Sequence, residues 1–442
     1  MTDNHSAEGD VASSTTQLQT FTLDDLWKDP RLVAIDSLVY DITGFAKVHP
    51  GGSGPLLAAG GTDVTALFRS MHRRQPKDVE RYREVLSKYR VGVLSPAVKN
   101  MEFDSEFAQD LYREVCETVP PALWFAPTGF WVRTALIVVG TLLAELGWIL
   151  TGSWQLCVLV GVLHAQIGLA VQHDASHGAV SRNWRWNSAL AYGADWIGNT
   201  RWLWFEQHII GHHPNTNADM DPDASSAEPF LLFRTVDYSL RKAYHRFQHW
   251  FMYPVLSLYG PSVVYNLPQL LTLNHNDEVP VKNNKFLQKQ LLPSILFRLF
   301  YYVRVILLPL YIGGAPLWLA LLGVNFVTGF CLTFVFVLSH NFVGSCRFPE
   351  RDQNDWYKMQ VETSCTYGGF VSGLMTGGLN FQIEHHLFPR LNSYWYPTIA
   401  PVVRRVCAKH GVQYTYYPTI IHNMRSTIEF MRLNGISKVR VD

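Results

Sequence analysis

Four long apolar stretches limit the folds that this chain can adopt. They occur as two pairs, 130–150 with 154–171 and 291–311 with 316–338, and only a short turn separates the members of each pair. Each stretch approaches the roughly 20 residues that an α-helix needs to cross a bilayer. Only 17 % of the 442 residues are charged, which is below the roughly 25 % of an ordinary soluble protein. We therefore expect two transmembrane helical hairpins. The alternative is a set of buried core helices.

Ionisable side chains interrupt these stretches at Glu145, His164, Arg298 and Arg304. Such side chains are costly inside a bilayer. We expect both arginines to lie near a helix end or to face protein. Between the hairpins, residues 250–273 are aromatic and contain three prolines. Because proline interrupts a helix, a membrane-surface or re-entrant helix is expected there.

The positions of the basic residues predict the orientation in the membrane. Two hairpins return the chain to its starting side, so the segments outside them share one side. Basic residues follow the first hairpin and residues 382–386: Arg182, Arg185, Arg201, Arg404, Arg405 and Lys409. The positive-inside rule makes that side cytosolic, with both termini on it.

Histidines gather in three clusters on the predicted cytosolic side: His173-Asp174-Ala175-Ser176-His177, 208–213, and Gln382-Ile383-Glu384-His385-His386. In a helix, residues four apart lie on one face, so the imidazoles of each cluster can converge. Neutral imidazole suits iron, zinc and copper, and seven imidazoles exceed the needs of one tetrahedral metal. We predict a two-metal site with the ligands His173, His177, His208, His212, His213, Gln382, His385 and His386.

Each cluster alone has a simpler explanation, since histidines four apart are often two surface residues. His340 closes the fourth apolar stretch and is either an extra metal ligand or a hydrogen-bonded structural residue. Asp174 and Glu384 lie within the clusters and are candidate acceptors for imidazole N–H groups. Their alternative is simple solvation.

The N-terminal part contains a further pair of histidines. Residues 1–20 are polar and lack the apolar core of a signal peptide, so we expect a disordered tail. Residues 21–95 alternate short strands and helices around His49-Pro50-Gly51-Gly52, with His72 following 23 residues after His49. Proline and two glycines make a low turn that lets a flat ligand approach the backbone. Alone, this motif is more often an ordinary turn.

This segment resembles the cytochrome b5 domain, from Val39-Tyr40-Asp41-Ile42 through the turn and Gly61-Thr62-Asp63-Val64-Thr65 to Tyr89-Arg90-Val91-Gly92. The resemblance implies a b-type haem with His49 and His72 as axial ligands. The sequence has no C-x-x-C-H motif, so covalent attachment is not supported. A haem with both axial positions filled carries electrons and does not bind oxygen.

The whole chain after the tail resembles the cytochrome b5-fused front-end fatty acid desaturases. The resemblance rests on the three clusters, on glutamine as the first residue of the third, on Trp202-Leu203-Trp204, and on Thr216-Asn217 and Asp221-Pro222-Asp223. It implies oxygen-dependent insertion of a cis double bond between an existing one and the carboxyl end of a polyunsaturated acyl chain, bound to coenzyme A or phospholipid. The eight cluster residues named above would hold two non-haem irons as the catalytic site.

The resemblance also implies NADH-cytochrome b5 reductase as electron donor, O2 as co-substrate and a place in the endoplasmic reticulum membrane. Two stretches, 360–370 and 408–412, look most like microbial delta-5 desaturases of C20 chains, ahead of delta-6, delta-8 and delta-4 enzymes. One departure concerns the second cluster, where three residues separate His208 from His212 and many members have two. Spacing of four still keeps both residues on one helical face.

The expected fold is mainly α: a tail (1–20), a small α+β cytochrome b5-like domain (21–95), a linker with an amphipathic helix (96–128), and an integral-membrane desaturase domain (129–442) of about four transmembrane helices with a cytosolic histidine-box cap. A net charge of +1 and six scattered cysteines give no support for nucleic-acid binding or a disulfide framework. Two rivals are a hydroxylase or sphingoid-base desaturase, and a membrane-anchored haem electron carrier that is not an enzyme.

Overall fold

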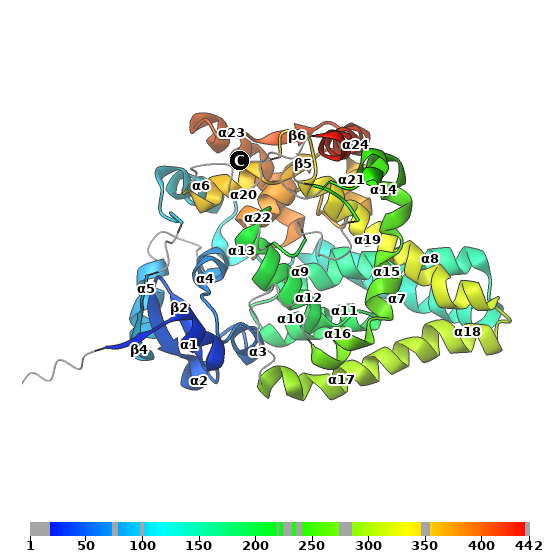
Figure 1. Ribbon diagram of the computed structural model, residues 1–442, viewed down its shortest axis with the longest axis horizontal. Coiled ribbons are helices and arrows are strands. Elements are labelled where there is room, and N and C mark those ends of the chain that lie inside the picture. Colours follow the sequence, from blue (N-terminus) through cyan, green and yellow to red (C-terminus); the bar gives the residue numbers. More distant parts are fainter. Residues whose placement is uncertain are drawn as a thin grey trace, which may run out of the picture.

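The computed structural model describes residues 18–72, 78–97, 101–218, 221–223, 232–235, 241–273, 285–345 and 354–437. Residues 1–17 of the predicted tail therefore lie outside the described part. Figure 1 shows a small domain at one end of the molecule, a bundle of long helices at the other, and a helical cap above the bundle.

The small N-terminal domain is built on a four-stranded sheet in the order β1-β4-β3-β2. Strand β1 (Gln19–Phe21) pairs in parallel with β4 (Arg90–Leu94), and β3 (Leu38–Asp41) pairs antiparallel with β4 and with β2 (Leu32–Ile35). All four residues of β2 are buried. The surrounding helices are α1 (Leu23–Lys28), α2 (Ile42–Phe45), α3 (Ser53–Ala58), α4 (Thr65–His72) and α5 (Asp78–Ser87).

The amphipathic helix expected in the linker is α6 (Glu106–Thr118), which Ser105 caps. Phe107, Leu111 and Val115 recur at four-residue spacing and are buried, because α6 packs on α23 (Tyr396–Lys409). The same core includes residues of α20 (Trp356–Glu362) and α22 (Gln382–Leu387). This cap ties the linker to the C-terminal part of the chain. A short turn, η1 (Pro121–Leu123), leads to the bundle.

The bundle consists of two helical hairpins. In the first, α7 (Thr128–Thr151) is followed by α8 (Trp154–Gln166), η2 (Ile167–Gln172) and α9 (His173–Ser176). The second runs through α17 (Lys285–Tyr301), η5 (Tyr302–Leu307) and α18 (Leu308–Tyr311), then returns through η6 (Leu319–Gly323) and α19 (Val324–His340). Four helices of the described residues are long and apolar enough to cross a membrane. The predicted hairpins are confirmed.

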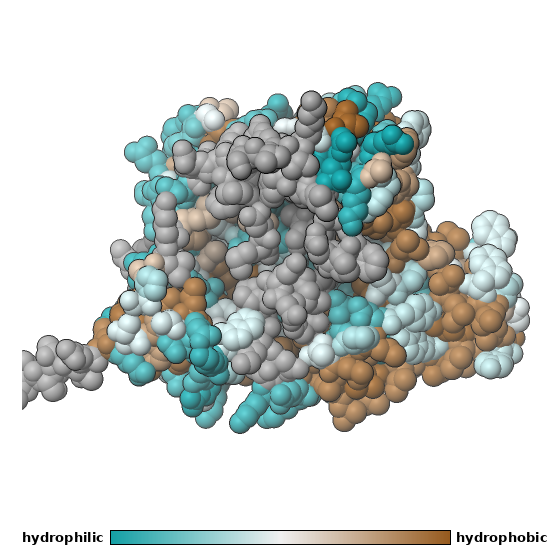
Figure 2. All heavy atoms as spheres, viewed as in Figure 1, coloured by the Kyte–Doolittle hydropathy of each residue, from teal (hydrophilic) through white to brown (hydrophobic). Residues whose placement is uncertain are grey.

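The turns of the two hairpins touch each other. Gly152 has φ +58°, and a Cβ there would lie 2.5 Å from the backbone oxygen of Gly313. Glycine is therefore required at this crossing. Both turns therefore lie at one end of the bundle. The histidines of α9 and the histidine that ends α19 come together at the opposite end of the bundle. Figure 2 shows hydrophobic side chains gathered over the region of α8, α17 and α18, as expected for a surface in lipid.

The ionisable residues inside the bundle form a buried network. Glu145 accepts hydrogen bonds from Arg304, from His164 Nε2 (2.6 Å) and from Trp196 Nε1 (3.1 Å). Arg298 donates to the backbone oxygens of Val263 and Val264 instead. Both arginines thus face protein, because pairing offsets the cost of placing a charge in the apolar bundle.

Shorter helices fill the space between the bundle and the cap. The segment 250–273 forms α14 (Gln248–Leu256), α15 (Tyr259–Val264) and α16 (Leu267–Thr272), none of which is long enough to cross a membrane. The remaining elements are α10 (Trp184–Ala191), α11 (Gly193–Trp196), α12 (Arg201–Trp204), η3 (Phe205–His212), α13 (His213–Asn215), η4 (Ala243–Phe247), β5 (Cys365–Tyr367), α21 (Phe370–Met375), η7 (Ser393–Trp395), β6 (Thr415–Tyr417) and α24 (Ile420–Ile436). Strands β5 and β6 pair in parallel.

We predict that Gly260→Ala destabilises the bundle. A Cβ at Gly260 would lie 1.9 Å from the backbone oxygen of Asn325, so α15 would have to move away from α19. Overpacking of this kind costs about 1–3 kcal/mol. Thermal unfolding in detergent should show a lower melting temperature. The matched control is Gly140→Ala in α7, where a Cβ would meet only methyl groups of Leu163 at 3.9 Å. Equal melting temperatures for the two variants would contradict the close crossing.

Candidate metal centre and haem site

The three histidine clusters lie on helices that end at the same place. His173 begins α9, and His177 is the residue that caps it. His208 and His212 belong to η3, whereas His213 begins α13. His385 and His386 lie in the last turn of α22, and His340 is the last residue of α19. All of these imidazoles are buried.

Two segments of these helices differ from the expected α-helix. Segments η2 and η3 are π-helical, and η3 contains His208 and His212. A π-helix has more residues per turn than an α-helix and is frequently found at functional sites. The rings of His208 and His212 are nevertheless stacked, with centroids 5.4 Å apart. The longer spacing in the second cluster therefore keeps both rings on one side.

The clusters meet in space. The Nε2 atom of His208 lies 3.2 Å from that of His173 and 3.1 Å from that of His213. His213 Nε2 in turn lies 3.0 Å from His385 Nε2. Residues separated by more than 170 positions in the sequence thus bring their ring nitrogens into contact.

The converging nitrogens form two neighbouring groups. His173, His177, His208 and His385 each offer a ligand atom, and all four atoms lie within 4.8 Å of one another. The same holds for His212, His340 and His386. The ring of His213 lies between the groups, with its centroid 4.6 Å from that of His177 and 4.4 Å from that of His386. Gln382 is buried at the start of α22, one turn before His385 and His386.

The donors fit a pair of bound metal ions. Within the described residues, both ring nitrogens of His177, the Nε2 atoms of His212 and His386, and both amide atoms of Gln382 are buried without a hydrogen-bond partner. Buried polar atoms normally have partners, and a metal ion would supply one. Burial, reinforced by neighbouring histidines, holds the pKa well below the ordinary value for five of the imidazoles: His177, His208, His213, His385 and His386. Neutral imidazole is the form that binds metals.

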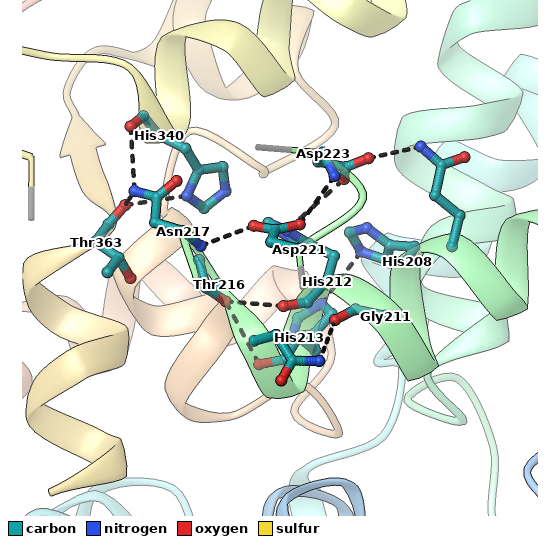
Figure 3. Close-up of polar contacts among 12 residues, drawn as sticks. His208, Gly211, His212, His213, Thr216, Asn217, Asp221, Asp223, His340 and Thr363 are labelled. Atoms are coloured by element: carbon teal, nitrogen blue, oxygen red, sulfur yellow. Dashed lines mark hydrogen bonds and ion pairs between the residues drawn. The ribbon is translucent and has the colours of Figure 1, made fainter. Parts of the chain in front are cut away.

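A carboxylate beside the second group orients His212. Its Nδ1–H donates to Asp221, whose two oxygens both lie 3.0 Å away. Burial opposes protonation of His212, but Asp221 and Asp223 raise its pKa to about 8. Asp221 also accepts a 2.7 Å hydrogen bond from the backbone N–H of Asn217, as Figure 3 shows. The carboxylate is thus held in place, and Nε2 of His212 is left to face the cluster.

Other outer partners orient further rings. His340 Nδ1 donates to the backbone oxygen of Thr363 (3.1 Å), and Asn217 Nδ2 donates to the same oxygen (3.2 Å). His386 Nδ1 donates to Gln360 Oε1 (2.8 Å), and His385 Nδ1 pairs with the Tyr396 hydroxyl (3.0 Å). An acceptor on Nδ1 places the lone pair on Nε2, where a metal can bind.

The predicted acceptors Asp174 and Glu384 do not perform this task. Asp174 Oδ2 accepts from Asn392 and Ser393, and its other oxygen is 3.6 Å from His173 Nδ1, too long for a hydrogen bond. Glu384 accepts from Tyr414 and Thr366, and burial raises its pKa to about 7. A side chain next to a ligand histidine in a helix points elsewhere, so sequence proximity was the wrong guide. The motif Asp221-Pro222-Asp223 was the available signal for Asp221.

The two histidines predicted to bind haem, His49 and His72, face each other in the N-terminal domain. Their ring centroids lie 6.1 Å apart. His49 Nδ1–H donates to Gly52 O (2.8 Å), and His72 Nδ1–H donates to Phe68 O (3.0 Å). Because a carbonyl oxygen only accepts, Nε2 of each ring carries the lone pair. An imidazole nitrogen lies about 2 Å from a bound metal, so rings on opposite sides of one ion have centroids about 6 Å apart. The pair fits a haem iron.

Comparison with known proteins agrees with this geometry. Residues 146–418 match the fatty acid desaturase family, and residues 17–95 match the cytochrome b5-like heme/steroid binding domain. The chain is 33 % identical to an acyl-lipid (7-3)-desaturase of Rebecca salina over 96 % of its length and 95 % of that protein. The corresponding protein of Diacronema lutheri is 34 % identical, with 98 % and 97 % covered. Delta(5) fatty acid desaturase A of Dictyostelium discoideum is 29 % identical, with 94 % and 91 % covered.

These matches account for the histidine clusters and for the pair of histidines in the N-terminal domain. The cytochrome b5 domain binds haem, and desaturases use histidine-bound di-iron with O2 as co-substrate, which is the kind of donor set described above. The four apolar helices make the protein an integral membrane protein. The chain therefore belongs to the fatty acid desaturase family, as a front-end acyl-lipid desaturase with a fused cytochrome b5 domain.

Proposed function

We propose that the two groups of buried imidazoles hold the two irons. One iron would be bound by His173, His177, His208 and His385, and the other by His212, His340 and His386. His213 lies between the groups and would serve either iron, and Gln382 would complete the set. The observation that carries this assignment is the convergence of ligand atoms to within 4.8 Å in each group. His49 and His72 are proposed as the axial ligands of the haem.

The two irons and O2 supply the strong oxidant that an unactivated methylene C–H bond needs. Acid–base and nucleophilic side chains cannot supply it. The residues of this chain keep that oxidant away from water, since every imidazole of the two groups is buried. Asp221, Gln360 and Thr363 would keep each Nε2 lone pair directed at its metal. The protein thus contributes ligand orientation and exclusion of solvent.

The acyl chain is proposed to approach the irons beside His173. A small cavity of about 30 Å³ lies there, lined mainly by apolar side chains that include Leu169, Ile197, Leu332 and Phe336. This volume accommodates about one water molecule. An acyl chain would therefore enter only as these side chains move apart on binding.

Several positions on the acyl chain are candidates, and the relatives are named for more than one of them. The sequence patterns favour delta-5 desaturation of C20 polyunsaturated chains. The relatives named acyl-lipid (7-3)-desaturase are 33 and 34 % identical to this chain, and those named for delta-5 are 28 and 29 % identical. The higher identity favours the (7-3) specificity over delta-5. The names of these relatives also favour a chain carried on a lipid over one carried on coenzyme A.

The electron supply and orientation are also proposed. The tethered haem domain would have a high effective concentration at the irons. NADH-cytochrome b5 reductase would reduce it from the cytosol, on the side where the haem domain and the histidine clusters lie together. The endoplasmic reticulum is the proposed membrane.

We predict that purified protein contains about three irons per chain, one of them in haem. His385→Ala should lose non-haem iron and all desaturation, because His385 belongs to the first group of proposed iron ligands. The haem absorption spectrum should be unchanged, because His385 is not one of the proposed haem ligands. His49→Ala should lose the haem spectrum but keep the non-haem iron. The control is His422→Ala, since His422 is exposed in α24, away from the clusters. Full turnover by His385→Ala would overturn the assignment.

Asp221→Asn should weaken metal binding by about 10- to 100-fold, the usual effect of removing an outer partner of a ligand histidine. An amide accepts more weakly than a carboxylate, so Nε2 of His212 becomes less basic. Competition with a chelator, followed by iron analysis, measures this. Asp24→Asn is the control, because Asp24 pairs only with Lys28 at the surface of the described structure. If the chelator concentration that removes half of the iron were the same for Asp221→Asn as for the parent protein, a role for Asp221 in metal binding would be rejected.

Cells that express the chain and receive a panel of C18, C20 and longer polyunsaturated acids should form a new cis double bond between the carboxyl end and the first existing one. Gas chromatography of their lipids identifies the acid converted and the position. A product that carries a hydroxyl group, or a modified sphingoid base, would point to the rival enzyme classes. A loaded protein with no product at all would favour the electron carrier.

A further inference from the structure

A short helix lies between the haem domain and the metal-binding histidines. Helix α12 (Arg201–Trp204) carries two tryptophans, one at the second position and one at the last. They point to different partners: Trp202 packs on the haem domain, and Trp204 packs on the histidine clusters. One residue, Leu203, separates them in the chain.

Trp202 is in close contact with the haem-binding turn. A Cβ placed on Gly54 in α3 would lie 2.7 Å from Cη2 of Trp202, so the indole touches the backbone there. Gly54 comes two residues after Gly52, whose carbonyl oxygen accepts the Nδ1–H of His49. Trp202 Nε1 donates to Gln290 Oε1 (3.3 Å), which fixes the ring in this position.

Trp204 is in contact with the other site. Its ring centroid lies 4.5 Å from that of His208, at an interplanar angle of 31°, and 5.6 Å from that of His173. Both separations are within the range of direct ring contact. His208 and His173 belong to the first group of proposed ligands. The indole therefore covers that group on the side of η3.

Apolar side chains of both domains pack against one side of this helix. A single core cluster joins Phe68 of the haem domain to Leu203 of α12 and to Phe205 and Ile209 of η3. Arg390, beyond α22, donates to the backbone oxygen of Met71 in α4 (3.4 Å). The haem domain is thus docked by apolar packing and a polar contact, and the two tryptophans are partly buried against the shared core.

We propose that Trp202 and Trp204 carry single electrons from the haem to the irons. The proposal rests on the ligand assignment made under the proposed function. Electrons cross covalent and π-bonded groups in contact more readily than gaps or aliphatic contacts. Each transfer takes one electron from the reduced haem and delivers one to the metal pair. Two transfers, two protons and O2 convert –CH2–CH2– into –CH=CH– and release two molecules of water.

A third tryptophan offers a matched control. A Cβ on Gly52 would lie 3.1 Å from the ring of Trp184, so this indole also packs on the haem-binding turn. Among the described residues, however, Trp184 makes no ring contact with a clustered histidine. Trp184 thus contacts the haem domain as Trp202 does, but its helix provides no second tryptophan in contact with the clustered histidines.

The test follows the oxidation of the haem in the full-length protein loaded with haem and iron. The haem and the irons are all reduced with dithionite in the absence of oxygen and the excess is removed; mixing with O2 and the acyl lipid in a stopped-flow spectrometer then oxidises the irons, which draw the electron from the haem. Trp202→Leu and Trp204→Leu should slow the return of the oxidised haem spectrum by about tenfold or more, since the bridging π-systems are removed. Trp204→Phe should recover most of the rate. Trp184→Leu should stay within about twofold of the parent protein, with unchanged melting temperature.

Two further measurements separate conduction from other effects. Iron content and haem spectrum should be unchanged, and irons reduced directly by excess dithionite with a small viologen mediator should form the double bond in one turnover as in the parent. Parent-like oxidation rates in both leucine variants would overturn the bridge, and so would equal slowing in Trp184→Leu, which would indicate docking alone. If Trp204→Leu loses iron, the oxidation rate of Trp202→Leu alone tests the bridge, because Trp202 makes no ring contact with the clustered histidines in the described part of the chain. A parent protein that forms no double bond after direct reduction would reject the proposed function instead.

Discussion

The structure depends on bringing many buried imidazoles together, for five of which burial holds the pKa far below the ordinary value and so keeps the ring uncharged. A buried ring nitrogen without a partner costs about 1–3 kcal/mol, and several such nitrogens are present in the two groups. The protein holds them in place through acceptors on the opposite ring nitrogens, provided by Asp221, Gln360, Thr363 and Tyr396. Bound irons would repay this cost. The apo protein is therefore expected to be strained at this site.

The membrane bundle provides the base on which this arrangement stands. The hairpin turns meet at Gly152 and Gly313, so the opposite helix ends emerge side by side. Glu145 and Arg304 fix the first hairpin against the second through a buried ion pair. An insoluble substrate also requires a site at the lipid surface. One architecture thus serves both the alignment of ligands and access for the acyl chain.

The haem domain is packed against the desaturase domain through small residues. Gly52 and Gly54 allow Trp184 and Trp202 to reach the backbone of the haem-binding turn. A side chain at either glycine would separate the domains at this contact. The short turn from His49 to Gly54 thus carries a proposed haem ligand and also the glycines that let the desaturase domain pack closely.

The sequence by itself determined the two hairpins, the histidine clusters and the pair of histidines in the cytochrome b5 domain, because hydrophobic length, helical spacing and a proline-glycine turn are local properties. Tertiary structure decided the rest. The π-helical form of η2 and η3 is set by packing of the surrounding helices, and propensity does not indicate it. Asp174 and Glu384 were wrong as imidazole acceptors, whereas Gln360 and Tyr396 lie 26 and 11 residues from their histidines. Which acceptor meets which ring depends on how remote segments fold together, and local sequence carries no record of that.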